Sequence, residues 1–135
     1  GFAGLMGAGR TELMRSLFGR SYGIYVSGTI VKDGKELTLR SVDAAIKARI
    51  AYVTEDRKAC GLLANRPVRE NLTISNLRRF SRLRFLRPRC ERSFARDMIG
   101  RLDIRLPGMD HEIQKLSGGN QQKVLLARWR QAGNL

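Results

Sequence analysis

The chain has 135 residues, of which 42% are hydrophobic and 28% are charged, and this size and composition suit one globular domain. It contains no apolar run of about 18 residues or more, and its first residues lack the basic and then apolar order of a signal peptide. Neither a membrane-spanning helix nor secretion is therefore expected, and we expect a cytoplasmic chain.

The formal net charge of +14 is large for this length and is concentrated in one segment. Residues 78–105 hold ten arginines against Glu91, Asp97 and Asp103. Such a block suits nucleic acid phosphates or lipid headgroups. It also suits a solvated helical surface whose acidic partners lie elsewhere in a longer chain, and we favour this second interpretation.

Cysteines and histidine are few. Cys60, Cys90 and His111 form no CxxC pair and no metal-ligand spacing, so neither a zinc site nor a disulfide framework is predicted. The sequence lacks an initiator methionine, begins within a predicted strand and stops just after an amphipathic helix. We interpret it as a piece of a longer protein.

The first predicted unit is a strand, a glycine loop and a helix. Residues 2–6 are a short apolar run that leads into glycines, and residues 11–18 carry apolar side chains at helical spacing. The segment GLMGAGRTEL, residues 4–13, overlaps the end of the first range and the start of the second. It places Gly4, Gly9 and Thr11 at the spacing G-x-x-x-x-G-K-[ST] of a phosphate-binding loop, with arginine in place of lysine.

This loop keeps most of the chemistry of a phosphate site. Its glycines let backbone N–H groups face phosphates, the helix N-terminus adds positive potential, and Thr11 retains the hydroxyl that holds magnesium. Arg10 keeps the charge but changes a compact ammonium into a planar fork. Because a misplaced charge-assisted hydrogen bond costs about 1.5 to 3 kcal/mol, we expect weakened nucleotide binding rather than its loss, and inefficient hydrolysis here.

Two other interpretations of the loop stay open on the loop alone. One is an ordinary structural turn between a strand and a helix. The other, a dinucleotide-binding loop, fits worse, because Gly7-x-Gly9 would require glycine at position 12, where the chain has Glu12.

Further along the chain, residues 27–37 alternate around Asp33-Gly34, which predicts a small antiparallel hairpin. Residues 41–49 begin with a capping serine and contain helix formers, and the apolar, β-branched residues 50–56 predict another strand.

The character of the sequence then changes. Residues 57–67 are predicted to be a loop, and residues 68–108 form a basic, largely helical insert that Pro107-Gly108 closes. Ser117 caps a final amphipathic helix. That helix belongs to LSGGNQQKVLLARW, residues 116–129, the most specific string in the chain. A serine followed by two glycines leaves the first N–H groups of the helix open to a phosphate, although a well-capped amphipathic helix would show the same string.

The segment LSGGNQQ resembles the signature motif of ABC-type ATPases, and its position after a P-loop-like segment and a helical insert is the order that this family uses. GLMGAGRTEL, YVTEDRKACGL and LSGGNQQKVLLARW together resemble the second nucleotide-binding domain of the tandem ATP-binding subunits of bacterial monosaccharide importers of the ribose, galactose and xylose type. The resemblance covers nearly the whole chain, and the arginine of the loop is typical of that second domain. Ala59-Cys60 departs from the polar pair usual in that group.

The resemblance implies an α/β fold, a P-loop NTPase (ABC ATPase) fragment with a small antiparallel β element and a helical insert. It divides the chain into a P-loop core fragment with the β element, residues 1–66, a helical subdomain, residues 67–115, and the signature motif with its helix, residues 116–135. The strand that ends in Asp-Glu and the switch histidine of the family fall outside the chain, and His111 is not that histidine. We therefore expect no appreciable ATP hydrolysis by this piece alone.

ATP and Mg²⁺ are the ligands that the resemblance implies. Glu55 stands where ABC proteins generally carry a glutamine that touches magnesium and links the site to the helical insert. Its carboxylate and the hydroxyl of Thr11 are the implied Mg²⁺ contacts, and a solvated strand end is the alternative for Glu55. The implied nucleotide-binding residues are Gly4, Leu5, Met6, Gly7, Ala8, Gly9, Arg10, Thr11 and Glu12.

In the family, two nucleotide-binding domains pack head to tail, so that each ATP lies between the P-loop of one domain and the signature of the other. The resemblance thus implies that Ser117, Gly118 and Gly119 reach the γ-phosphate of a nucleotide on the other domain. Residues 4–12 then hold their own nucleotide mainly as a structural or regulatory ligand. The implied signature residues are Leu116, Ser117, Gly118, Gly119, Asn120 and Gln121.

The implied partners are the other nucleotide-binding domain, membrane permease subunits that contact residues 57–80, and indirectly a periplasmic sugar-binding protein. The implied location is peripheral, at the cytoplasmic face of the inner membrane, and no specific nucleic acid is expected. Two rivals remain. One is a non-transport ABC ATPase of DNA repair or translation, and the other is a basic nucleic-acid-binding module with Phe80, Phe85 and Phe94 among its arginines.

Overall fold

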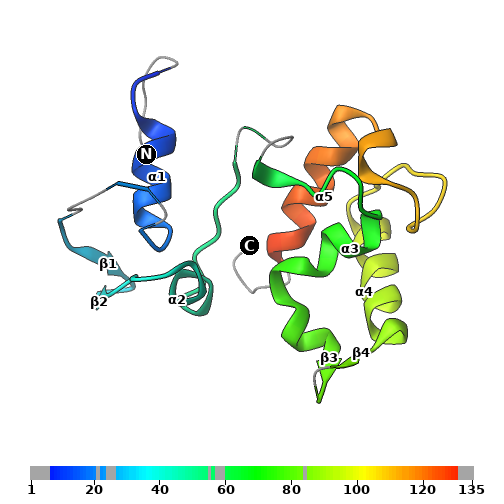
Figure 1. The fold of residues 1–135 in the computed structure, drawn as a ribbon, viewed down its shortest axis with the longest axis horizontal. Coiled ribbons are helices and arrows are strands. Elements are labelled where there is room, and N and C mark those ends of the chain that lie inside the picture. Colours follow the sequence, from blue (N-terminus) through cyan, green and yellow to red (C-terminus); the bar gives the residue numbers. More distant parts are fainter. Residues whose placement is uncertain are drawn as a thin grey trace. The chain divides into compact units, whose positions relative to one another are not determined.

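The structure is a computed structural model that describes residues 7–20, 22–23, 27–54, 56, 60–83 and 85–130. The chain forms two compact units, Gly1–Tyr52 and Val53–Leu135, and each is described by itself (Figure 1). The three-part division of the chain that the sequence implies stays a prediction.

The described residues of unit 1 form two helices and one hairpin. Helix α1 covers Arg10–Leu17, which confirms the helix predicted after the glycine loop. Strands β1 (Ile30–Lys32) and β2 (Lys35–Leu37) pair antiparallel, with Ile30 opposite Leu37. The turn that joins them is Asp33-Gly34, and both residues have positive φ, 53° and 73°, as a two-residue hairpin turn requires. The predicted strand at residues 2–6 lies outside the described residues.

Helix α2 covers Val42–Lys47 and begins where the sequence predicts it. The Ser41 hydroxyl accepts a hydrogen bond from the backbone N–H of Ala44 at 3.1 Å, which satisfies one of the open donors of the first turn. Ala45 is fully buried, and the ring of Phe18 lies 5.8 Å from that of Tyr52, so α2 and the end of α1 contribute to a small apolar core.

Gly19 lets the end of α1 approach the start of α2. Its φ is 72°, and a Cβ built on it would lie 2.2 Å from the Ser41 carbonyl carbon and from the Val42 nitrogen. We expect Gly19→Ala to lower the free energy of unfolding of unit 1 by about 2 kcal/mol, because both the backbone conformation and the close approach exclude a side chain. Urea denaturation followed by circular dichroism measures this change.

The matched control is Gly28→Ala. Gly28 also has positive φ, 133°, but a Cβ there would meet nothing within 4 Å. Gly28→Ala therefore introduces backbone strain without a clash. It should lower the free energy of unfolding by less than Gly19→Ala does. Equal losses in the free energy of unfolding from the two substitutions would show that the close approach of α1 to α2 contributes nothing to the effect of Gly19→Ala.

The prediction of a strand at residues 50–56 is wrong for the residues that the structure describes. Residues 50–54 and Asp56 have no strand conformation. Their β-branched, apolar sequence favours a strand, but a strand forms only when a neighbour completes its ladder of hydrogen bonds. The strands in the described part of the chain belong to two small hairpins, and neither pairs with this segment.

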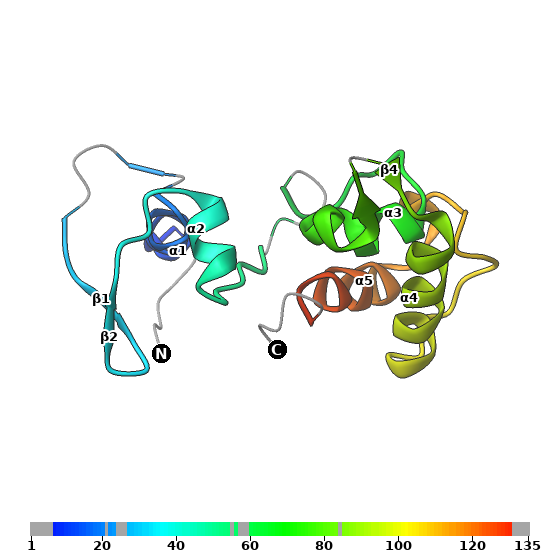
Figure 2. The same cartoon turned by 90° about the horizontal axis from the view of Figure 1, so that it is seen from below.

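In the part of unit 2 that the structure describes, the regular elements are helices and one small hairpin, and α3 packs against both α4 and α5 (Figures 1 and 2). Its elements in chain order are α3 (Val68–Thr73), the 3-10 helix η2 (Ile74–Phe80), β3 (Ser81–Arg82), β4 (Phe85–Leu86), α4 (Pro88–Arg101), the 3-10 helix η3 (Ile113–Lys115) and α5 (Gly118–Arg130). The largely helical segment predicted at residues 68–108 is confirmed by α3, η2 and α4. The final helix is confirmed by α5.

The core of unit 2 is one apolar cluster that the three α-helices and their loops share. Its buried members are Leu62, Val68, Leu72, Ala95, Met98, Ile104, Ile113, Leu116, Val124, Leu125 and Ala127. Phe80 and Phe94 pack beside it, with ring centroids 5.4 Å apart. Two of the three phenylalanines considered as a nucleic acid platform therefore pack against each other.

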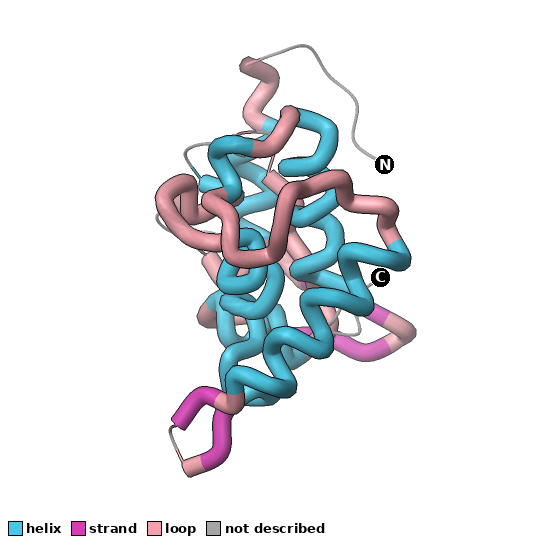
Figure 3. Tube along the Cα trace, turned by 90° about the vertical axis from the view of Figure 1, so that its right-hand side faces the viewer, coloured by secondary structure: helices cyan, strands magenta, loops and turns pink. Residues whose placement is uncertain are grey.

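The β3–β4 hairpin was not predicted. It pairs Ser81 with Leu86 and interrupts the helical segment, so the insert is two helical pieces rather than a continuous run. Pro88 explains where the second piece begins, because proline disfavours the helical conformation in the residue before it and suits the first helical position. Arg87 is accordingly extended, and α4 starts at Pro88. Figure 3 shows this hairpin projecting from the helices.

Candidate functional site

The described part of the phosphate-binding loop runs directly into α1. Gly7 and Gly9 have φ of 85° and 77°, the left-handed region in which glycine is free and other residues are strained. The N–H of Leu13 donates to the carbonyl of Gly9 at 3.0 Å, so the N–H groups of residues 10–12 lie in the first turn, where an α-helix supplies no acceptor. This is the arrangement that binds phosphate at a helix N-terminus.

The two loop glycines are needed for conformation rather than for space. A Cβ on either Gly7 or Gly9 would meet nothing within 4 Å. The open surroundings leave room for an anion above the first turn, next to Arg10 and Thr11. The predicted members Gly4, Leu5 and Met6 lie outside the described residues, whereas Ala8 and Glu12 lie with the other loop residues.

A cavity of about 390 Å³ in unit 1 is not part of this loop. Ser16 and Leu17 line it from the last turn of α1, Arg20 lines it from the segment that follows, and the β1–β2 hairpin lines its other side. It therefore lies at the end of α1 opposite to Gly9. The predicted phosphate site of unit 1 therefore consists of backbone donors at the start of α1 and does not include this cavity.

The signature segment forms a second helix start of the same kind. Helix α5 begins at Gly118, and the N–H of Gln121 donates to the carbonyl of Ser117 at 3.0 Å. The N–H groups of residues 118–120 are therefore the ones without an acceptor inside the helix. Ser117 and Gly119 are exposed, and a Cβ on Gly119 would meet nothing within 4 Å.

Asn120 fixes the first turn of α5 to the loop that follows α4. Its side-chain amide donates to the Ser117 hydroxyl at 3.0 Å, and its carbonyl oxygen accepts from the backbone N–H of Arg105 at 3.0 Å. The ammonium group of Lys123 donates to the carbonyl of Asp103 at 2.6 Å. Three polar contacts thus position the turn that carries the open N–H groups.

Two of the predicted signature residues are buried. Leu116 belongs to the apolar core and is 8% exposed. Gln121 is also 8% exposed, and its side-chain amide donates to the carbonyls of Ile113 and Leu116 at 3.3 and 3.0 Å. Within this chain, both side chains hold the start of α5 against η3. Their predicted role at a phosphate stays a prediction.

The other end of α5 is anchored by a buried arginine that the sequence analysis missed. Arg128 donates from Nε to the backbone carbonyl of Asn71 at 2.8 Å, from one terminal nitrogen to the carbonyl of Gly61 at 2.6 Å, and from the other to Asn71 Oδ1 at 3.0 Å. Burial lowers the pKa of Arg128 to about 10, so its guanidinium stays protonated at neutral pH.

Asn71 is itself fully buried and joins several backbone groups. Its Oδ1 accepts from the N–H of Leu63 at 2.8 Å, and its Nδ2 donates to the carbonyls of Leu63, Arg66 and Pro67 at 3.0 to 3.2 Å. Arg128 could have been found from the sequence, because it lies four residues after Val124 and seven after Gln121, on the buried face of α5.

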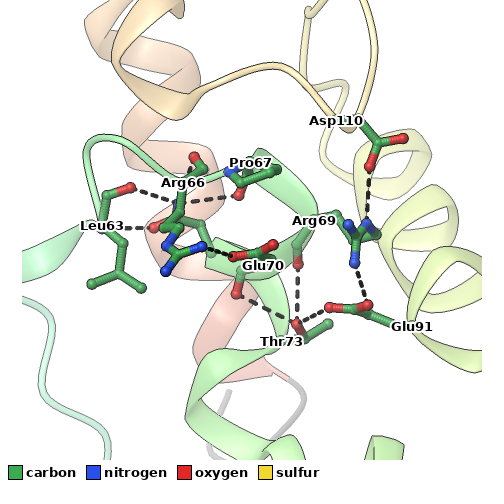
Figure 4. Close-up of polar contacts among 9 residues, drawn as sticks. Leu63, Arg66, Pro67, Arg69, Glu70, Thr73, Glu91 and Asp110 are labelled. Atoms are coloured by element: carbon green, nitrogen blue, oxygen red, sulfur yellow. Dashed lines mark hydrogen bonds and ion pairs between the residues drawn. The ribbon is translucent and has the colours of Figure 1, made fainter. Parts of the chain in front are cut away.

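A second polar cluster joins α3 to α4 (Figure 4). Arg69 contacts the buried carboxylate of Glu91 and donates to Asp110 at 3.0 Å, and the Thr73 hydroxyl donates to Glu91 at 2.9 Å. Burial disfavours the charged guanidinium of Arg69, but the hydrogen bonds and negative charges of Asp110 and Glu91 outweigh burial and raise its pKa. The cluster therefore stabilises the packing of α3 against α4, and α3 in turn packs against α5.

No cluster of three or more His, Cys, Asp or Glu residues that suits a metal ion occurs in the described part of the chain. Glu55, the predicted partner of Thr11 at magnesium, lies outside the described residues. Among the described helices, none has the length and apolar character needed to cross a membrane.

Comparison with known proteins places these features in a family. The family model described as ABC transporter matches residues 1–131. The ribose import ATP-binding protein RbsA of Oceanobacillus iheyensis is 45% identical over 129 residues, which are 96% of this chain and 26% of that protein. The L-arabinose transport ATP-binding protein AraG of Geobacillus stearothermophilus is also 45% identical, over 96% of this chain and 25% of that protein.

The ribose import ATP-binding protein RbsA of Streptococcus agalactiae is 43% identical over the same shares, 96% and 26%. The chain thus spans about a quarter of the length of these relatives, and no solved structure matches it. The α/β, P-loop NTPase fold predicted from the motifs is confirmed by the family match. The chain belongs to the ABC transporter family.

Proposed function

We propose that the chain supplies two phosphate-binding elements to the ATP-binding subunit of an ABC-type sugar importer. The observation that carries this proposal is the pair of helix starts at α1 and α5, each with glycines and a turn of open N–H groups. Relatives 43 to 45% identical to this chain are named as ribose import and L-arabinose transport ATP-binding proteins.

At the first element, the N–H groups of residues 10–12 bind phosphate oxygens of ATP, and Arg10 adds a positive charge. The Thr11 hydroxyl and the carboxylate of Glu55 would hold Mg²⁺, which would neutralise part of the charge of the phosphates. Mg²⁺ in such sites keeps waters and phosphate oxygens and needs only one or two protein groups.

The second element acts on a nucleotide held by another domain. In this proposal, Ser117, Gly118 and Gly119 meet the γ-phosphate across a head-to-tail pair of nucleotide-binding domains, and this chain is the second domain of a tandem subunit. The exposure of Ser117 and Gly119 supports a contact outside the chain. The arginine in the first loop supports a mainly structural or regulatory nucleotide there.

The remaining partners follow from the same proposal. Membrane permease subunits bind the ATP-binding subunit at the cytoplasmic face of the inner membrane, and a periplasmic sugar-binding protein delivers the sugar. Residues 57–80 are the proposed permease surface, and Arg128 ties the described part of this segment to α5 through the carbonyls of Gly61 and Asn71. Because α5 contains both Arg128 and the signature turn, a movement of this surface would be transmitted to the signature turn along α5.

A chimera tests the function. The 129 matching residues of the ribose import ATP-binding protein of Oceanobacillus iheyensis are replaced by this chain. We expect the chimera to assemble with the permease of that transporter and to retain ATP hydrolysis and ribose uptake in vesicles. A folded, assembled chimera that no longer hydrolyses ATP would contradict the proposal.

The same experiment separates the non-transport alternative. A chimera that hydrolyses ATP but does not bind the permease would place the chain among ABC ATPases outside transport. Retained ribose uptake favours the importer. The nucleic acid alternative has little structural support, because Phe80 is 3% exposed and packs on Phe94.

A further inference from the structure

The β3–β4 hairpin exposes large apolar side chains. Leu83 is 84% exposed, Phe85 is 79% exposed and Leu86 is 51% exposed. Leu77 and Ile74, on the preceding η2, are exposed by 40% and 37%. Figures 1 and 3 show the backbone of the hairpin projecting beyond the helices of unit 2. Leu83, Phe85 and Leu86 all belong to this one hairpin, and we call these three residues its apolar tip.

The turn of this hairpin is made by a residue that turns usually avoid. Leu83 has a φ of 50°, a conformation that glycine, asparagine or aspartate adopts at lower cost. The β1–β2 hairpin of the same chain uses Asp33-Gly34 at the equivalent place. A leucine in the left-handed region that is also exposed to water serves neither the turn nor the core, which points to a contact outside the chain.

The surroundings of the tip are strongly basic. Residues 74–90 contain six arginines and no aspartate or glutamate. Arg78, Arg79, Arg87 and Arg89 are exposed, and the described residues provide no carboxylate partner for any of them.

The basic character continues into a shallow groove. The residues that line a depression of about 700 Å³ between η2 and α4 include Arg79 and Phe80 of η2 and Arg89 and Phe94 of α4. Asp97 and Arg101 also line it and pair with each other at 2.8 Å. The two unpaired arginines therefore give this groove a net positive charge beside an apolar tip.

We propose that the β3–β4 hairpin, with Arg78, Arg79, Arg87 and Arg89, binds the surface of an anionic lipid bilayer. The apolar tip enters the boundary between headgroups and acyl chains, and the arginines meet lipid phosphates. Leu83 and Leu86 suit acyl chains and offer no flat ring on which a nucleic acid base could stack. Phe85 is the one aromatic ring among these three exposed side chains, so lipid fits the tip better than a stack of bases. This inference goes beyond the proposed nucleotide function and does not depend on it.

Sedimentation of the 135-residue chain with vesicles tests the proposal. We expect binding to vesicles of phosphatidylglycerol and phosphatidylcholine, much weaker binding to phosphatidylcholine alone, and a steep loss with salt. Because one arginine near an anionic surface contributes about fivefold to the partition coefficient, Arg78→Glu with Arg79→Glu should lower it by about 25-fold or more. The control Lys35→Glu with Arg40→Glu makes the same change in net charge within unit 1 and should have a much smaller effect.

The apolar contribution is tested separately. Leu83→Ser with Phe85→Ser removes the tip, and we expect at least about a tenfold loss of vesicle binding with an unchanged circular dichroism spectrum. Val31→Ser with Val53→Ser removes two other exposed apolar side chains and should leave binding unchanged. Absence of vesicle binding, equal effects of variant and control pairs, or equally tight binding to DNA through the same residues would each overturn the proposal.

Discussion

Gly119→Asp in the chimera with the Oceanobacillus iheyensis relative is expected to lower ATP turnover by about 100-fold or more. The carboxylate would lie at the open turn of α5, where the N–H groups of residues 118–120 are the proposed donors to a phosphate. It would both accept hydrogen bonds from these donors and repel the phosphate. Steady-state phosphate release by the assembled transporter measures the effect.

The surroundings of Gly119 make this result interpretable. A Cβ at this position would meet nothing within 4 Å, so Gly119→Ala should fold normally and lose much less activity than the aspartate variant. Comparable expression and thermal unfolding of the two variants would exclude a general structural cause. A large loss in both variants with a lowered unfolding temperature would instead assign Gly119 a role in folding.

Arg10→Ala is the comparison that tests asymmetry between the two elements. Arg10 lies next to the loop glycines, and its loss should weaken nucleotide binding at residues 4–12 while turnover at the other site continues. We therefore expect a decrease of about tenfold or less, from the loss of one charge-assisted hydrogen bond. Losses of equal size from Arg10→Ala and Gly119→Asp would refute the asymmetric arrangement.

Local chemistry explains which parts of the fold the sequence predicts. Asp33-Gly34 supplies the two positive φ values of its turn, and Ser41 supplies the cap of α2, so neighbouring residues determine both features. The strand predicted at residues 50–56 depends on a partner that local sequence does not provide. The β3–β4 hairpin was missed because Leu83 gives no turn signal.

In the candidate site too, features set by neighbouring residues are predicted from the sequence, whereas features set by contacts between distant residues are not. Glycine spacing and a serine before two glycines predict the two helix starts, because these patterns act within a few residues. The contact between Asn71 and Arg128 joins residues 57 positions apart and follows from packing of α3 against α5. A polar residue on an apolar helical face was the available signal, but such a face does not reveal which backbone groups it will meet.

Arg128→Met is expected to lower the free energy of unfolding of the chain by about 2 to 4 kcal/mol. The substitution removes three hydrogen bonds from a cationic donor and leaves the carbonyls of Asn71 and Gly61 without that partner. Methionine is long enough to occupy part of the same space, so the loss reports mainly on these bonds. Removing a buried charge offsets part of the loss, since burial already lowers the pKa of Arg128 to about 10.

Urea unfolding followed by circular dichroism measures the change, with Arg130→Met as the matched control. Arg130 is exposed at the end of the same helix, and its substitution should stay within about 0.5 kcal/mol. Arg128→Lys is informative as well, because an ammonium on a single stem cannot reach three acceptors in a fixed fork. A lysine variant as stable as the original would mean that charge alone anchors this helix.

A double-mutant cycle decides whether Asn71 and Arg128 act as one unit. Asn71→Ala removes the acceptor of one Arg128 bond and the donors to the carbonyls of Leu63, Arg66 and Pro67. Because the two side chains share a hydrogen bond, their effects on unfolding should depart from additivity by about 0.5 to 3 kcal/mol. Strict additivity would show that the side chains of Asn71 and Arg128 act independently, so that Arg128 would join α5 to this segment only through its bonds to the backbone carbonyls of Asn71 and Gly61.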